Sequence, residues 1–191
     1  IFWHNHYSKL WRQSSNHMSN LLVQNIKHTG GTTAMSVDSG GRVQFPNKPA
    51  YHVYYKTGGG GSGATGVVAW NTAKVNVGTM CNLSTGIATI PVSGLYHLYF
   101  VGLSANSSGG AMAGDVVFRI ETSTDNGASF SPQNTGFAHY VSGAQGYINA
   151  TACVTLDLSA NTQVRNNISS NHAYIDNSDE PYTYAGGYLI G

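Results

Sequence analysis

Short runs rich in aromatic and β-branched residues recur along most of this 191-residue chain, separated by Gly, Asn, Asp and Ser. Runs of this composition are typical of β-strands, and glycine-rich breaks between them are typical of turns. We expect strands at residues 50–56, 66–70, 73–77, 86–91, 94–103, 115–122, 137–141, 147–156, 162–168 and 182–190. About ten short strands without a long helical pattern predict an all-β sandwich or jelly roll.

The run at residues 94–103 is unusual because both of its faces are apolar. Side chains alternate between the two faces of a strand. One face carries Leu95, His97, Tyr99 and Val101, and the other carries Tyr96, Leu98, Phe100 and Gly102. In a monomeric sandwich one face is usually polar. The pattern therefore predicts a central strand whose second face is covered, either by loops or by another subunit.

The first 48 residues differ from the rest and divide the chain into three parts. Residues 1–30 hold Trp3 and Trp11 and form an arm too short to bury them alone. Within the arm, residues 19–27 fit either two helical turns or one strand. Residues 31–48 predict a short β linker, and residues 49–191 the jelly roll. Exposed Trp3 and Trp11 would form an adhesive patch, so the arm is expected to attach the chain to another protein.

Charged residues make up only 9% of the chain and apolar residues 41%, with a formal net charge of +1. An ordinary globular domain has about 25% charged residues. A surface of Ser, Thr, Asn, Tyr and Gly costs little free energy to desolvate, which suits packing against copies or neighbours. No basic stretch indicates nucleic-acid binding, and no run of about 18 apolar residues indicates a membrane span.

The motifs of the common enzyme classes are missing from the sequence. It contains no Gly-x-Ser-x-Gly elbow, no His-Glu-x-x-His and no phosphate-binding loop with its lysine. We therefore expect a binding or structural module that is not an enzyme and needs no cofactor. Cys81 and Cys153 lie in strand-like runs and are either two buried thiols or a single bridge.

Residues 70–100 carry the most specific pattern, in the spacing of Trp70, Asn76, Cys81, Ala88, Gly94, Tyr96, Leu98 and Phe100. This spacing resembles the signature of the C1q domain, with Trp70, Cys81, Ala88 and Leu98 departing from its usual residue types. Residues 49–53 look like the opening strand of that family and residues 184–190 like its closing strand. The resemblance implies a C1q/TNF-like jelly roll that assembles as a homotrimer. It also implies that Trp70, Tyr96, Phe100, Tyr188 and Leu189 form the core or the trimer contacts.

Residues 31–43 are similar to a linker, with the pattern Ile-Asp-x-x-Gly-Arg-Val-x-x-Pro, that precedes C1q-like tips in phage structural proteins. This similarity implies a virion protein, such as a fibre tip, a tail component or a capsid decoration. Its partners would be other virion proteins, bound through residues 1–30, and a glycan or protein of the host surface. The alternatives are a secreted, lectin-like C1q recognition protein and an architectural cement protein without a receptor.

Two groups of side chains suggest metal ions. Asp176, Asp179 and Glu180 supply the hard oxygen ligands that Ca²⁺ prefers, although a solvated loop explains them as well. His4 and His6 point to the same side of an extended chain. Three such strands around a threefold axis would present imidazoles suited to Fe or Ni, whereas the simpler interpretation is a pair of surface histidines.

Overall fold

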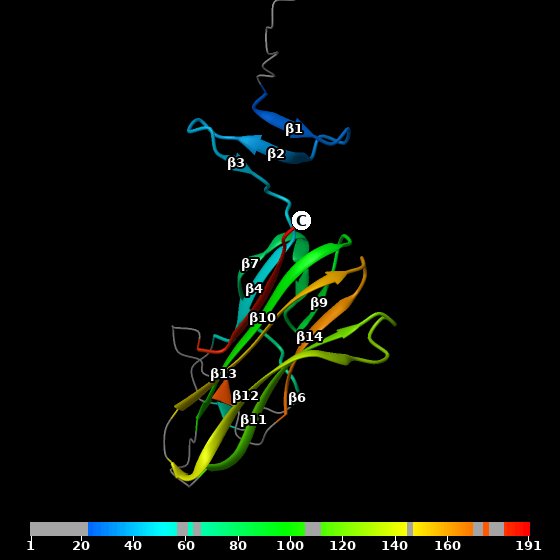
Figure 1. Ribbon diagram of the computed structural model, residues 1–191. Coiled ribbons are helices and arrows are strands. Elements are labelled where there is room, and N and C mark those ends of the chain that lie inside the picture. Colours follow the sequence, from blue (N-terminus) through cyan, green and yellow to red (C-terminus); the bar gives the residue numbers. More distant parts are fainter. Residues whose placement is uncertain are drawn as a thin grey trace, which may run out of the picture. The chain divides into compact units, whose positions relative to one another are not determined.

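The computed structural model describes residues 23–56, 61–62, 66–105, 112–144, 147–169, 174–175 and 182–191. The chain divides into two compact units, Ile1–Pro46 and Asn47–Gly191 (Figure 1). The described residues form strands and one 3-10 turn, η1 at Val77–Thr79, which confirms the predicted all-β class. Within these residues no helix is long and apolar enough to cross a membrane.

A five-stranded antiparallel sheet forms one layer of the larger unit, in the order β13-β10-β16-β4-β7. Strand β10, an inner strand of this sheet, pairs with β13 along its whole length and with β16 on its other side. The strands are β4 (Ala50–Tyr54), β7 (Thr72–Asn76), β10 (Gly94–Ala105), β13 (Tyr147–Leu158) and β16 (Tyr184–Leu189). The first and last strands of the unit are therefore neighbours inside one sheet.

The second layer has the order β12-β11-β14-β9-β8, and β6 also pairs with β14. Its strands are β6 (Gly66–Val67), β8 (Cys81–Asn82), β9 (Ile87–Thr89), β11 (Met112–Ser123), β12 (Ser131–Ala144) and β14 (Gln163–Ile168). Two further short strands, β5 (Gly61–Ser62) and β15 (Tyr174–Ile175), pair with each other. The chain passes repeatedly between the two layers, as it does in a jelly roll.

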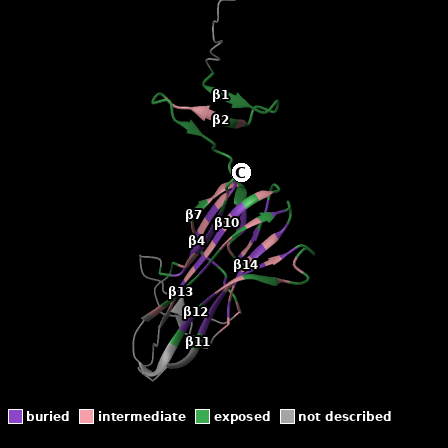
Figure 2. Cartoon of the chain, in the orientation of Figure 1, coloured by how far each residue is buried: buried purple, intermediate pink, exposed green. Residues whose placement is uncertain are grey.

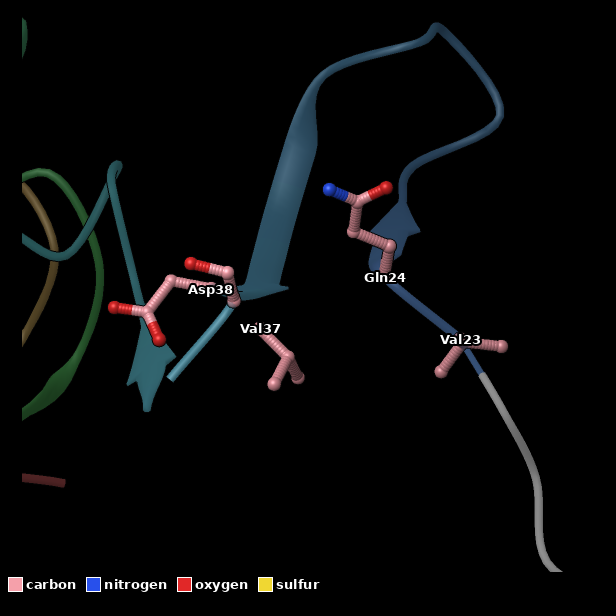
Figure 3. Close-up of a pocket in the computed structure, with 5 residues that line it drawn as sticks. Val23, Gln24, Val37 and Asp38 are labelled. Atoms are coloured by element: carbon pink, nitrogen blue, oxygen red, sulfur yellow. The ribbon is translucent and has the colours of Figure 1, made fainter. Parts of the chain in front are cut away.

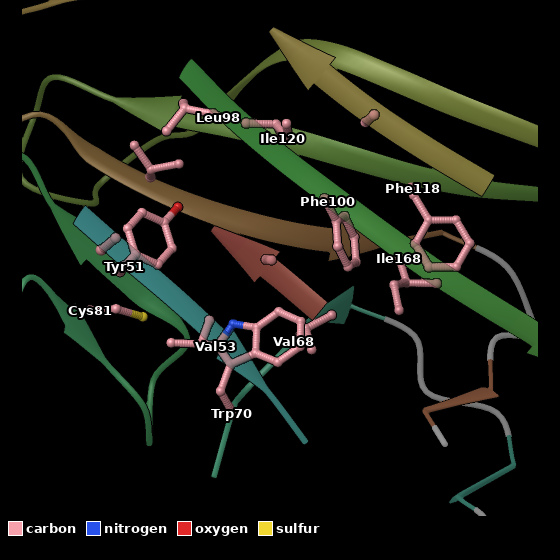
Figure 4. Packing of buried hydrophobic residues seen from close by; sticks show 14 of the residues in the cluster. Tyr51, Val53, Val68, Trp70, Cys81, Leu98, Phe100, Phe118, Ile120 and Ile168 are labelled. Carbon is pink, nitrogen blue, oxygen red and sulfur yellow. The ribbon is translucent and has the colours of Figure 1, made fainter. Parts of the chain in front are cut away.

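The core lies between the two sheets (Figures 2 and 4). Phe100 of β10 and Phe118 of β11 are fully buried, with ring centroids 5.0 Å apart in an edge-to-face arrangement. Trp70 packs edge-on against Phe100 at 6.1 Å. Aromatic pairs in this geometry add about 0.5–1.5 kcal/mol beyond the burial of their area. Tyr96 and Phe100 thus lie on the inner face of β10, in the alternation that the sequence predicts.

Strand β12 is longer than the sequence suggests. The expected strand covered residues 137–141, whereas β12 runs from Ser131 to Ala144. The first half of the strand has no apolar alternation in the sequence, because it consists of Pro132 and polar residues. Proline is tolerated there because β12 lies at the edge of its sheet and pairs only with β11. Pro132 also lies opposite Glu121, next to an irregularity in the ladder.

The smaller unit contains a three-stranded antiparallel sheet of β1 (Asn25–Lys27), β2 (Thr33–Val37) and β3 (Val43–Gln44). The sequence left residues 19–27 open between helix and strand, and the structure forms a strand at β1. Because β1 pairs with β2, the boundary expected at residue 30 falls inside one sheet. Residues 25–27, which the sequence assigns to the arm, therefore belong to this sheet.

The turn between β2 and β3 is held by one carboxylate. Asp38 accepts hydrogen bonds from the backbone N–H groups of Gly40 and Arg42, at 2.9 Å each, and from Nε of Arg42 at 2.7 Å. The two hydrogen bonds from Arg42 lower the pKa of Asp38 below its ordinary value, and the backbone hydrogen bond contributes more than the side-chain one. Gly41 has a φ of 78°, which a residue with a side chain rarely adopts. The Asp-x-x-Gly-Arg part of the linker pattern therefore specifies a hairpin turn.

Candidate functional site

The outer face of the five-stranded sheet carries the side chains that do not enter the core. Leu95, His97, Tyr99 and Val101 of β10 lie on this face, as the alternation in the sequence predicts. Side chains of β4 and β16 lie beside them. The register pairs His97 with Tyr188, Tyr99 with Gly186, and Gly186 with His52. Paired residues of neighbouring strands lie on the same side of a sheet. Aromatic rings from three strands therefore meet on this face, which we call the aromatic face (Leu95, His97, Tyr99, Val101, His52, Tyr184, Gly186, Tyr188).

A ring cluster occupies the centre of the aromatic face. Nδ1 of His52 lies 2.8 Å from the Tyr99 hydroxyl oxygen, a hydrogen-bond distance. The centroid of the His52 ring is 5.4 Å from that of Tyr184, and that of His97 is 5.5 Å from that of Tyr188. Tyr99 joins the two halves because its ring contacts those of His52, His97 and Tyr184. The cluster is half-buried even in a single chain.

Burial shifts the titration of the central pair. The pKa of His52 is lowered, first by desolvation and then by the positive charge of Lys74 on β7. Desolvation also raises the pKa of Tyr99, with a smaller contribution from Tyr184 and Tyr188. Both shifts favour the uncharged side chain. The centre of the aromatic face is therefore neutral around pH 7.

The β13 edge of this face is small and polar. Asn149, Thr151, Cys153 and Thr155 alternate outward along the strand, and each is exposed. Thr155 Oγ1 lies 3.1 Å from Nδ1 of His97. Cys153 is a free, exposed thiol and Cys81 is a free, buried one, so the two cysteines are not bridged.

The outer face of the second sheet has a different character. Arg165 of β14 binds Glu121 of β11, with Nε 2.7 Å from Oε2, and its guanidinium lies 3.9 Å from the centroid of Phe130. On the same sheet His139 lies 2.7 Å from an Asp115 oxygen. Charged side chains thus gather on this face. On the outer face of the five-stranded sheet the charged residues Asp157 and Lys74 lie toward the β13 and β7 edges, and the ring cluster at its centre holds no Asp, Glu, Lys or Arg. Of the two outer faces, only the aromatic one has the composition of a surface buried on association.

Single-chain exposure supports this assignment. Leu95, Tyr188 and Ile190 are 40%, 46% and 44% exposed and lie at the end of the sheet where β10 begins and β16 ends. Leu189, between the last two, points the other way and packs partly against the core. A continuous patch of exposed apolar groups is a common mark of a protein–protein contact.

The residues of the sequence signature are structural. Trp70, Cys81 and Ala88 are buried in the core. The Asn76 side chain pairs with the backbone of Cys81 through two hydrogen bonds, of 2.8 Å to its carbonyl oxygen and 2.9 Å from its N–H. A local hydrogen-bonding role of this kind is common for an asparagine beside a turn. None of these side chains is placed to bind a ligand.

Several sequence candidates lie outside the described residues: Trp3, Trp11, His4, His6, Asp176, Asp179 and Glu180. In the part of the chain that is described, no group of three or more His, Cys, Asp or Glu side chains could hold a metal ion. A shallow hollow of about 260 Å³ lies between η1 and β9 and is lined by Gly78, Thr79, Met80, Asn82, Ile87, Thr89, Ile90, Pro91 and Asn161. Its lining contains no ionisable side chain and suggests no catalysis.

Known structures share this architecture. The globular domain of zebrafish complement 1qA protein is similar with a TM-score of 0.55 and 17% identity, over 75% of this chain and 98% of that one. Eiger TNF from S. frugiperda is similar with a TM-score of 0.58 and 11% identity, over 76% and 94%. No protein-family profile and no curated protein matches the sequence. The chain therefore has a C1q/TNF-like jelly-roll fold, as its sequence pattern predicted.

The sequence predicts the half of the aromatic face that β10 contributes. The alternation in residues 94–103 places His97 and Tyr99 on it, but His52, Tyr184 and Gly186 come from strands about 45 and 85 residues away along the chain. Their only signal was the similarity of the first and last strands to those of the C1q family. Tyr188, which the resemblance assigned to the core or the trimer contacts, lies on the aromatic face.

Proposed function

We propose that this chain is a non-enzymatic structural or binding protein that works as a homotrimer, with the aromatic faces of three jelly rolls packed around a common axis. The observation that carries the proposal is the contrast between the two outer sheet faces. One holds the Arg165–Glu121 ion pair and the contact between Asp115 and His139. The other holds Tyr99, Tyr184 and Tyr188 around two histidines. Burying the aromatic face desolvates few ions and removes a large aromatic area from water.

A more specific role is that of a virion structural protein, in a phage fibre or tail tip or in a capsid decoration. Its support is the similarity of residues 31–43 to the linker that precedes C1q-like tips in phage proteins. The Asp38–Arg42 turn is consistent with it, because the residues of that pattern are the ones that hold the hairpin. In this role the trimer stabilises the particle or recognises a glycan or protein of the host surface.

The second candidate is a secreted C1q-like recognition protein outside any virus. It is favoured by the fold shared with a complement protein domain of zebrafish. Both candidates use the same trimer and differ in where the protein is found. Mass spectrometry of virus particles purified from the source culture separates them, since only the virion protein would copurify with particles in stoichiometric amount.

The trimer itself is tested on the full chain by light scattering and sedimentation equilibrium. We expect the mass of three chains at micromolar concentration. The variant Tyr188→Glu places a charge on the aromatic face at a residue that is 46% exposed in one chain, so it should fold and stay monomeric. The matched control is Phe137→Glu, which places the same charge at a 69% exposed residue of the second sheet and should remain trimeric.

A wild-type protein that stays monomeric at high concentration would refute the proposal. So would a Tyr188→Glu variant that trimerises as well as Phe137→Glu. If Phe137→Glu alone dissociated, the interface would lie on the second sheet and the aromatic face would need another explanation.

A further inference from the structure

The small sheet of β1, β2 and β3 has one apolar face and one polar face. Ile26 pairs with Met35, and Val37 pairs with Val43, so all four side chains lie on one side. Asn25 pairs with Ser36 and Ser36 with Gln44, which puts three polar side chains on the other side. The alternation is as regular as in a sheet that covers a core.

Among residues 23–46, the part of the small unit that the structure describes, no core covers that apolar face. None of its described residues up to Gln44 is buried, and Ile26 and Val43 are 45% and 52% exposed. A sheet with one hydrophobic face buries that face against another element. Ten strand residues cannot supply that packing themselves, so the face needs a partner surface.

A hollow at one end of the sheet adds to this exposed surface. It has a volume of about 400 Å³, is open to solvent, and is lined by Val23, Gln24, Val37, Asp38 and Ser39. Figure 3 shows Val23 and Gln24, on the segment that leads into β1, beside Val37 and Asp38 at the end of β2. Its two valines provide an apolar surface that an apolar side chain of a neighbour can contact.

We infer that the partner is the same face of two other copies, so that three small sheets close into a trimeric collar with Ile26, Met35, Val37 and Val43 toward its axis. The inference rests on the proposed jelly-roll trimer. Only residues 45–49 separate β3 from β4, a link that spans at most about 20 Å. Three sheets tethered so closely have an effective concentration in the millimolar range or above. A foreign partner would have to compete with copies that are always present.

The link is also stiff, and the one charged side chain that the register places beside the apolar face, Lys27, lies at its edge, opposite Thr33. Pro46 and Pro49 restrict the backbone within those residues and reduce the entropy lost when the sheets meet. The charges of the hairpin turn, Asp38 and Arg42, neutralise each other through a 2.7 Å contact. The apolar face can therefore be removed from water at a small polar cost.

The test is disulfide cross-linking in the full chain. In a Cys153→Ser background, which leaves only the buried Cys81, single cysteines are introduced as Val43→Cys on the apolar face and as Gln44→Cys on the polar face. Mild oxidation of each purified trimer is followed on non-reducing denaturing gels. We expect covalent dimers to form at least about tenfold faster with Val43→Cys, and to stop short of completion because one cysteine in each trimer lacks a partner.

Residues 43 and 44 are adjacent in β3 and lie on opposite faces of the small sheet, so each position is a control for the other. A trimer in which Gln44→Cys cross-links as fast as Val43→Cys, or in which Val43→Cys does not cross-link, overturns the collar and leaves the jelly-roll trimer intact. A full chain that sediments as a monomer overturns both proposals.

Hydrogen exchange gives a second readout that does not depend on disulfide geometry. In the wild-type trimer the amides of β2 should be protected, and Met35→Glu should reduce that protection by at least about tenfold while β10 stays protected. The control Ala34→Glu, on the polar face, should leave β2 protected. Wild-type β2 amides that exchange at the rate of an unstructured peptide would contradict the collar.

Discussion

The ring of Tyr99 lies directly over the backbone of Gly186, so closely that a methyl group at position 186 would come within 2.1 Å of the Tyr99 hydroxyl oxygen. The two residues are paired across β10 and β16. Because Gly186 has no side chain, the Tyr99 ring can pack flat against the sheet, and its hydroxyl oxygen lies 2.8 Å from Nδ1 of His52. The flat arrangement of the aromatic face therefore depends on a residue that contributes no ring.

Replacing Gly186 with alanine should disrupt this arrangement. The added methyl group would also come within 2.6 Å of the Tyr51 carbonyl oxygen, so the backbone as well as the Tyr99 ring must move. Overpacking of this kind costs about 1–3 kcal/mol, measurable as a lower free energy of unfolding in urea. We expect weaker trimers as well. Gly191→Ala is the control, because a methyl group there meets nothing within 4 Å, and an equal loss in both variants would contradict the argument.

Phe100→Ala should remove the centre of the core. Phe100 is fully buried between Trp70 and Phe118, and truncating such a residue costs about 3–5 kcal/mol. Chemical denaturation should show this loss, and size-exclusion chromatography should show that assembly fails with it. Phe137→Ala, at a 69% exposed position, should change the free energy of unfolding by less than about 0.5 kcal/mol.

Stability should fall as the pH drops below about 6.5. The folded chain holds the pKa of His52 below its ordinary value of 6.5, so unfolding takes up a proton between the two values. The contribution of neutral His52 is therefore complete above pH 6.5 and is lost progressively toward the lowered pKa. Urea midpoints measured between pH 5 and 8 at constant protein concentration should show this slope. His52→Gln should flatten it, and an unchanged slope would count against His52 as its source.

The two thiols should differ in reactivity. Burial raises the pKa of Cys81 to about 12, whereas Cys153 is exposed on β13. A thiol reacts as its thiolate, so native Cys81 should resist iodoacetamide. In the Tyr188→Glu monomer, in which the aromatic face is not covered by a partner, mass spectrometry after brief alkylation should find label only on Cys153, and in denaturant on both. Native labelling of Cys81 in the Cys153→Ser variant would show that β8 opens more readily than its packing implies.

Removal of the arm should separate attachment from assembly. We expect a chain lacking residues 1–22 to remain trimeric, because β1 begins at Asn25 and the jelly roll is untouched. Without Trp3 and Trp11 it should no longer bind the structure to which the full chain attaches. The double variant Trp3→Ala and Trp11→Ala tests the same idea without truncation. A truncated trimer that still binds normally would place attachment elsewhere.

Local patterns in the sequence predicted the strands and the sandwich architecture of this fold. They did not predict contacts between residues that are distant along the chain. The alternation in residues 94–103 identifies both the inner and outer sets of β10, because a strand has a fixed period of two. The first half of β12 was missed because Pro132 is acceptable only at a sheet edge, and edges are set by the tertiary fold. Gly186 carried no signal of its own, since its role depends on the Tyr99 ring of another strand.

The ends of the larger unit suggest how it could be used as a scaffold. Tyr188 pairs with Ala50, Lys48 Nζ donates to the Ile190 carbonyl oxygen at 2.9 Å, and the Leu95 N–H donates to that of Gly191. The polypeptide thus enters and leaves the jelly roll side by side (Figure 1). Pairs such as Ala105 with Tyr147 mark the opposite end. A reporter domain fused after Gly191 would be anchored beside the point of entry, which leaves the opposite end unobstructed for display of grafted peptides.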